Sequence, residues 1–273
     1  MKIIRSVSEM IQVRQQLSGK VGIVPTMGAL HEGHISLVQQ CRSHSDHVVV
    51  SIYVNPLQFG PKEDFDKYPR NLSQDTELLS DEGVDIVFAP EELGEQNSET
   101  KVIPGELSTL WCGKNRPQHF EGVLSVITKL FNIISPTDAW FGQKDFQQFR
   151  IIEKWVEDFY VPVNLHRAMI VREKMGLAIS SRNAYLNLDQ KYNAKNIYKS
   201  LTAAKSAFMQ GETSTKVVLE LSKDYLKKMK IEYHAIIDPV TLKPCDKVFI
   251  GSVLVLAVKL GQVRLIDNMI FDM

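Results

Sequence analysis

The chain has 273 residues, enough for one large domain or two of ordinary size, and its 44% hydrophobic and 23% charged residues are typical of a soluble globular protein. Its 32 basic residues balance its 32 acidic ones, so it lacks the bulk charge with which proteins hold nucleic acid or an anionic membrane. The three cysteines, Cys41, Cys112 and Cys245, lie far apart, which disfavours a disulfide framework and favours a reducing cytoplasm.

Apolar β-branched runs alternate with helical patterns over the first two-thirds of the chain. Residues 1–17 read as a short strand and an amphipathic helix rather than a signal peptide, and no run of about 20 apolar residues is present to span a bilayer. This alternation predicts a doubly wound, Rossmann-like parallel sheet that binds ligands at the carboxyl ends of its strands. The expected strands are 21–24, 48–54, 85–89, 138–141 and 164–171, and the expected helices are 34–43, 122–134 and 146–159.

The last hundred residues change character. Two charged segments, 191–209 and 213–229, have helical patterns, and three short apolar runs, 233–237, 253–258 and 264–266, are expected to be strands. The less regular alternation predicts a smaller α+β domain. We therefore divide the chain into a Rossmann-like domain, 1–172, and a carboxyl-terminal domain, 173–273.

The segment PTMGALHEGH, residues 25–34, lies between the strand at 21–24 and the next helix. Turns at this position bind phosphates in α/β folds, because backbone N–H groups and the helix dipole face the anion. Gly28 and Gly33 allow the backbone to approach a ligand closely. His31 and His34 are three residues apart and share one helical face, where imidazoles can stabilise charge on a phosphoryl group.

Two other interpretations apply to paired histidines. His44 and His47 have the same spacing without the glycines, and we interpret them as surface residues. A zinc site is disfavoured, because H-E-G-H lacks the four-residue spacing of H-E-x-x-H and no third ligand is near. Neither G-x-x-x-x-G-K-[ST] nor G-x-G-x-x-G occurs, so the chain is neither a P-loop enzyme nor a standard dinucleotide binder.

A family resemblance accounts for this motif. PTMGALHEGH resembles the H-x-G-H signature of the nucleotidylyltransferase superfamily, in the form found in the pantothenate synthetases, or pantoate–β-alanine ligases. The matching blocks follow one another in the same order and cover nearly the whole chain. They are SIYVNPLQFG at 51–60, YPR at 68–70, RPQHFEGV at 116–123, FGQKDFQQ at 141–148, GLAISSRNAYL at 176–186 and RLIDNM at 264–269.

The resemblance implies a two-step reaction. The carboxylate of pantoate attacks the α-phosphorus of ATP to give pantoyl adenylate and pyrophosphate, and β-alanine then displaces AMP to give pantothenate. Mg²⁺ accompanies the ATP phosphates, without a metal site made of protein ligands alone. The resemblance also implies a homodimer, and we expect the carboxyl-terminal domain to close over ATP as a lid.

The same resemblance assigns roles to individual residues. His34, assisted by His31 and Lys144, is the expected hydrogen-bond donor or acid in adenylate formation, while Gln58 and Gln148 bind pantoate and β-alanine. By composition alone, Lys144 and Asp145 are interpreted as an ordinary pair of charged surface residues. The resemblance implies instead that Lys144 binds phosphate and that Asp145 binds the ribose of ATP. The expected ATP-binding residues are Met27, Gly28, Ala29, Leu30, His31, Glu32, Gly33, His34, Gly142, Gln143, Lys144, Asp145, Val171, Ile179, Ser180, Ser181 and Arg182.

One of these segments departs from the family pattern. Ser180, Ser181 and Arg182 resemble the second signature of the superfamily and are expected to bind the β- and γ-phosphates. Met175 and Ile179 stand where family members commonly have Asp and Met.

Two alternatives remain at this point: a nucleotidylyltransferase that acts on a phosphate ester, and a non-catalytic nucleotide-binding module. A tRNA-charging role is disfavoured, because no basic anticodon-binding extension is present.

Overall fold

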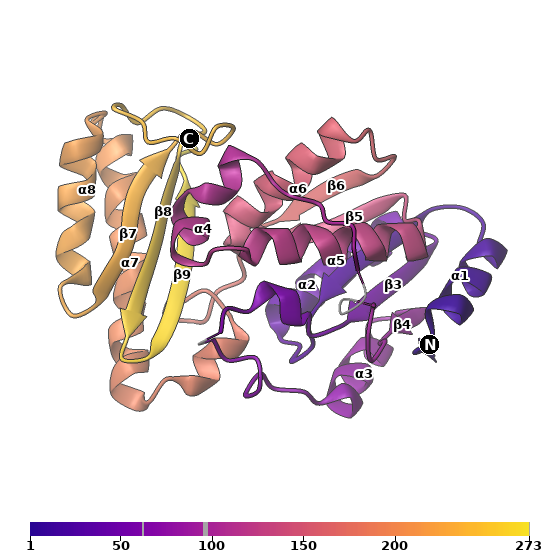
Figure 1. Ribbon diagram of the computed structural model, residues 1–273. Helices are drawn as coiled ribbons and strands as arrows, with labels where there is room; N and C mark the ends of the chain where they lie inside the picture. The colour runs from indigo at the N-terminus through magenta and orange to yellow at the C-terminus, as the bar shows by residue number, and fades with distance from the viewer. Residues whose placement is uncertain (62, 95–97, 273) are drawn as a thin grey trace.

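Two β-sheets organise the chain (Figure 1), and the computed structural model describes residues 1–61, 63–94 and 98–272. The larger sheet has the order β1-β4-β3-β2-β5-β6, and all of its strand pairs are parallel. Starting from β2, the chain adds β3 and β4 on one side and then returns to place β5 and β6 on the other. The predicted doubly wound sheet is confirmed, and its topological switch point lies between β2 and β5. The strands are β1 (Lys2–Ile4), β2 (Val21–Thr26), β3 (His47–Ile52), β4 (Ile86–Phe88), β5 (Asp138–Gly142) and β6 (Asn164–Ala168).

Helices cover both faces of the larger sheet, which explains why its central strands are apolar on both sides. Alternate strand residues enter two separate cores: Ile23 and Val49 pack with α1, α5 and α6, whereas Val24 and Val50 pack with α2 and α3. The helices on one face are α1 (Val7–Gln16), α5 (His119–Ile134) and α6 (Phe146–Asp158). Those on the other are α2 (Glu32–His44) and α3 (Leu72–Asp81). No sequence-based prediction was made for α3 or for the short helix α4 (Trp111–Asn115).

The smaller sheet is antiparallel, with the order β7-β8-β9, and α7 and α8 pack on one of its faces. Its elements are α7 (Leu188–Met209), α8 (Thr215–Lys223), β7 (Lys230–Ile237), β8 (Val253–Leu260) and β9 (Val263–Ile270). The predicted α+β domain is confirmed in class, but several boundaries differ; β7, for example, begins at Lys230 rather than at 233. The helix expected at 213–229 ends at Lys223 and continues as a 3-10 turn, and the strand expected at 264–266 is longer because β9 pairs with β8 along its whole length. Within the described residues, no helix is long and apolar enough to cross a membrane.

The two sheets meet through a small apolar core. Phe146, at the start of α6, is buried with Ile237, Val253 and Val255 of the smaller sheet and with Leu242. The chain passes between the sheets after β6, where Arg172 and Ala178 form an isolated antiparallel bridge. The boundary at 172/173 stays a prediction, and it falls inside this bridged segment.

Candidate active site

A cavity of about 240 Å³ opens at the carboxyl ends of β2 and β5, the switch point at which this sheet is expected to bind a ligand. Most of the predicted site residues line it, although they come from four distant parts of the chain. The lining includes Met27, His31, Gly33, His34, Gln58, Gly142, Lys144, Asp145, Gln148, Val171, Ile179, Ser180, Ser181 and Arg182. Gly28, Ala29, Leu30, Glu32 and Gln143 belong to the same turns but are not part of the wall.

The turn after β2 has a left-handed backbone, with φ of 79° at Gly28 and 51° at Ala29. The buried carboxylate of Asp75, on α3, accepts hydrogen bonds from the N–H groups of Ala29 at 3.0 Å and Leu30 at 2.8 Å. A Cβ at Gly28 would lie 2.9 Å from Asp75 Oδ2, so glycine suits both the conformation and the close packing. Asp75 thus fixes the turn, and two N–H groups of the predicted phosphate-binding segment already have a protein acceptor. Contacts of Ala29 and Leu30 with ATP stay a prediction.

The two histidines of this turn stack on each other at the start of α2. Their ring centroids lie 4.0 Å apart, and a Cβ at Gly33 would come within 3.0 Å of the His31 ring. Burial, helped by the positive charge of Lys144, lowers the pKa of His31 to about 4. Burial also lowers the pKa of His34 well below its usual value, with His31 and Lys144 adding to the effect. Both imidazoles are therefore neutral near pH 7, and His34 is suited to donate a hydrogen bond rather than to act as a cationic acid.

Lys144 and Asp145 lie in a 3-10 turn, Gln143–Asp145, that joins β5 to α6. Lys144 lines the same cleft as the two imidazoles, and its positive charge adds to the lowering of the pKa of both. Gln148, one turn into α6, also faces the cleft. The structure thus brings together, from two separate loops, the three groups predicted to act on the phosphates.

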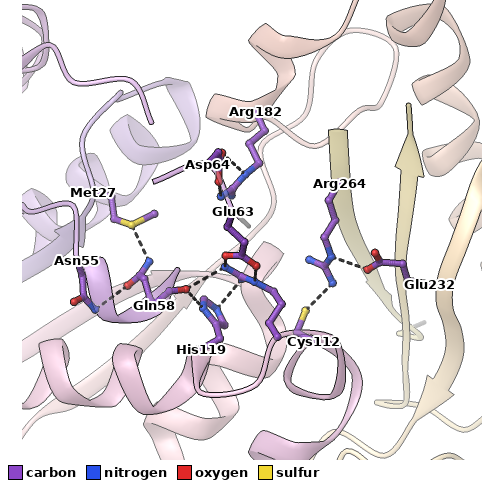
Figure 2. Close-up of polar contacts among 11 residues, drawn as sticks. Met27, Asn55, Gln58, Glu63, Asp64, Cys112, His119, Arg182, Glu232 and Arg264 are labelled. Atoms are coloured by element: carbon purple, nitrogen blue, oxygen red, sulfur yellow. Dashed lines mark hydrogen bonds and ion pairs between the residues drawn. The ribbon is translucent and has the colours of Figure 1, made fainter. Parts of the chain in front are cut away.

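A hydrogen-bond network orients Gln58, which also lines the cleft (Figure 2). Asn55 Nδ2 donates to Gln58 Oε1 at 3.3 Å and to the Gly122 carbonyl at 2.9 Å. The Gln58 carbonyl lies 2.8 Å from His119 Nδ1 and accepts from Arg116 Nη2 at 3.2 Å. No role was predicted from the sequence for Asn55, Arg116 or His119, although blocks that carry the family resemblance contain all three.

The late serine–arginine segment closes the cleft from the side of the smaller domain. Arg182 pairs with Asp64 through two contacts, Nη2 to Oδ1 at 2.9 Å and Nε to Oδ2 at 3.1 Å (Figure 2). Ser181 Oγ lies 3.4 Å from the hydroxyl of Tyr68. The Val171 carbonyl accepts from Ile179 N–H at 3.0 Å, and the adenine contact of Val171 stays a prediction. Met175, one of the two departures from the family pattern, is exposed.

Two acidic side chains beside the cleft, Glu63 and Asp64, are not part of its lining and are paired with arginines that are. Glu63 receives two hydrogen bonds of 2.6 Å from Arg116, and the neighbouring Asp64 binds Arg182. Across the part of the chain that the structure describes, no group of three or more His, Cys, Asp or Glu side chains could hold a metal ion. The second histidine pair is separate from the cleft, with His44 exposed and its ring 5.9 Å from that of His166.

Comparisons with known proteins agree on one family. A family model described as pantoate-beta-alanine ligase matches residues 2–270. A pantothenate synthetase of Fervidobacterium nodosum is 46% identical over 279 residues, covering 100% of both chains. A crystal structure of pantothenate synthetase from Thermus thermophilus superposes with a TM-score of 0.95 at 39% identity over 100% of both chains. A pantoate-beta-alanine ligase from Francisella tularensis, complexed with beta-gamma ATP and β-alanine, gives a TM-score of 0.84 at 32% identity, over 99% of this chain and 98% of that one.

Proposed function

Because the chain belongs to the pantoate–β-alanine ligase family, we propose that the cleft between β2 and β5 binds ATP and pantoate and forms the adenylate there. The chain is an AMP-forming ligase: it condenses pantoate with β-alanine to pantothenate through pantoyl adenylate, releasing pyrophosphate and AMP. The observation that carries the assignment of the site is the stack of two buried, neutral imidazoles beside the charge of Lys144 at the switch point.

In the first step a carboxylate oxygen of pantoate attacks the α-phosphorus, and the bond to the bridging oxygen of pyrophosphate breaks. His34 donates an N–H to an α-phosphate oxygen, and Lys144 supplies positive charge to the same group, so negative charge developing on phosphorus is stabilised. The amides of Gln58 and Gln148 offer a donor and an acceptor each, which suits a hydroxy acid. Asp145 accepts hydrogen bonds from the ribose hydroxyls.

In the second step the amine of β-alanine attacks the acyl carbon of the adenylate. AMP leaves with the bonding electron pair, and the new amide nitrogen loses a proton. The role of the protein here is to hold both reactants in line and to keep water from the adenylate. Arg182 and Ser181, which line the same cleft as the histidines, are suited to contact the β- and γ-phosphates in the first step and to release them as pyrophosphate.

Mg²⁺ fits this site as a companion of the nucleotide. It prefers oxygen ligands and usually keeps several waters, with phosphates and at most one or two carboxylates completing its shell. Because Glu63 and Asp64 already bind arginines, we propose that phosphate and water oxygens supply most of its ligands. The ion would neutralise charge on the leaving pyrophosphate.

Pantoate-dependent exchange of pyrophosphate into ATP tests the assigned site. His34→Ala should slow exchange by about two to three orders of magnitude, because one donor to the developing charge is lost. His44→Ala is the matched control, since His44 is exposed and outside the cleft, and its rate should equal that of the parent. Near-normal exchange in His34→Ala would contradict a catalytic role for His34, but it would not contradict the assignment of the overall reaction.

Three further proposals rest on the family and the sequence. A homodimer is expected, which light scattering would measure, and a cytoplasmic location agrees with the cysteine usage.

Residues 173–273 are proposed to act as a lid, with Arg182 exchanging Asp64 for the phosphates when ATP binds. Small-angle scattering with and without a non-hydrolysable ATP analogue measures this closure, and unchanged profiles would contradict a large movement.

A further inference from the structure

The turn that carries Lys144 and Asp145 lies between two spaces. On one side is the cleft of about 240 Å³, and on the other a cavity of about 50 Å³ lined by residues that include Lys144, Asp145, Asp267 and Asn268. The turn therefore has open space on two sides, where hydrogen bonds rather than packed side chains can hold it. The groups that hydrogen-bond to it decide where the ammonium of Lys144 and the carboxylate of Asp145 stand.

Asn268, on β9 of the smaller sheet, makes those hydrogen bonds. Its Nδ2 donates to the carbonyl oxygens of Gln143 at 2.9 Å and Lys144 at 3.0 Å. Its Oδ1 accepts from Gln143 Nε2 at 3.1 Å. Both donors and the acceptor of one amide are thus used on a single turn, and the orientation of the amide follows from its partners.

Asn268 is itself held rigidly. It is 2% exposed, and its backbone N–H donates to Asp267 Oδ1 at 2.8 Å. The buried carboxylate of Asp267 forms a two-pronged pair with Arg172, at 2.6 and 3.0 Å. Arg172 also donates to the Gly176 carbonyl at 3.0 Å, within the segment that leads to the late serine–arginine signature.

Two neighbouring residues of β9 therefore anchor both segments that are proposed to hold the ATP phosphates. Asn268 hydrogen-bonds directly to the turn that carries Lys144. Asp267 binds Arg172, and Arg172 in turn holds the segment that leads to Arg182. The arrangement explains how a strand from the smaller domain can set the geometry of a site at the switch point of the larger sheet (Figure 1).

We infer that Asn268 is a positioning residue for adenylate formation, acting through the turn that carries Lys144 and Asp145. This inference rests on the proposed function of that turn. Without the amide, two carbonyl groups and Gln143 Nε2 lose their partner, and the turn can shift toward either space. A displacement of about 1 Å at a reacting group can cost about 100-fold in rate, so adenylation should suffer while global folding is retained.

The test is a double-mutant cycle on pantoate-dependent pyrophosphate exchange. Asn268→Ala should slow exchange about 10- to 100-fold, and Lys144→Ala should slow it at least as much. In the Lys144→Ala background, Asn268→Ala should cost no more than about threefold further, because groups that act together are not additive.

Two further variants separate positioning from stability. Leu265→Ala removes a buried side chain of β9 that packs in the core of the smaller domain rather than on the turn, so it should lower the melting temperature without slowing exchange. Gln143→Ala removes one contact of the Asn268 amide from the other side. It should slow exchange by a smaller factor, about 3- to 10-fold, and it keeps the test available if Asn268→Ala does not fold.

The outcomes are distinguishable. Exchange at the parental rate in both Asn268→Ala and Gln143→Ala, or fully additive losses with Lys144→Ala, would overturn the role of Asn268. If Lys144→Ala itself exchanges normally, the proposed function of the turn fails instead. Slow exchange in Leu265→Ala equal to that of Asn268→Ala would show that loss of domain stability, rather than positioning, is responsible.

Discussion

Replacement of Asp75 by asparagine should damage the site without touching any residue of its wall. The side chain is 3% exposed and accepts two backbone hydrogen bonds, at 3.0 and 2.8 Å, from a turn in the left-handed conformation. Asparagine has almost the same shape, but it can accept only one of these bonds. Its NH₂ group then faces the other N–H, so one buried donor is left unsatisfied.

The expected cost follows from that geometry. A hydrogen bond to a charged group contributes about 1.5–3 kcal/mol, and an unsatisfied buried donor costs about 1–3 kcal/mol. Asp75→Asn should therefore lower the free energy of unfolding by about 2–3 kcal/mol. Because the same turn places His31 and His34, pantoate-dependent pyrophosphate exchange should fall about 10- to 100-fold.

Urea denaturation and the exchange assay measure both effects. Asp81→Asn is the matched control, because Asp81 lies on the same helix but is exposed, and it should leave both quantities unchanged. An Asp75→Asn protein whose unfolding free energy stays within about 0.5 kcal/mol of the parent, and which exchanges at the parental rate, would refute the view that Asp75 fixes the turn.

Two other predictions concern the titration of buried histidines and the Arg182–Asp64 ion pair. The pKa values of His31, His119 and His234 are lowered from 6.5 to about 4, mainly by burial, so the unfolded chain takes up protons first as the pH falls. Stability should be fully present above pH 6.5 and decline toward pH 4, seen as a falling urea midpoint; an unchanged midpoint between pH 7 and pH 5 would contradict burial of neutral imidazoles. Separately, Asp64→Asn should lower the KM for ATP about two- to fivefold by freeing Arg182 from an ion pair, whereas an unchanged or higher KM would argue against exchange of Asp64 for phosphate.

The fold was largely predictable because its signals are local. Continuous apolar runs such as residues 48–54 become central strands buried on both faces, and the alternation with helices specifies a parallel sheet. Element ends were less predictable, since β9 owes its length to pairing with β8 rather than to its own apolar residues. The helix α3 received no prediction, although it supplies Asp75.

Most of the predicted site residues line one cleft, and those that follow β2, β3 and β5 do so because the topology brings the ends of these strands together. The supporting residues could not be inferred in the same way. Three of these supporting residues, Asp75, Asn268 and Asp64, contact partners that lie 45 to 125 positions away in the sequence. The partners are backbone groups or a guanidinium, and no local sequence pattern predicts such long-range pairs. The neutral state of the histidines also depends on burial, which only the packed structure defines.

A crystal structure of the protein with a non-hydrolysable ATP analogue and Mg²⁺ tests the central claim most directly. We expect the α-phosphate within hydrogen-bond distance of the His34 ring and the Lys144 ammonium, with Arg182 moved from Asp64 to the terminal phosphates. Phosphates bound elsewhere, or the two imidazoles ligating a metal ion, would contradict it.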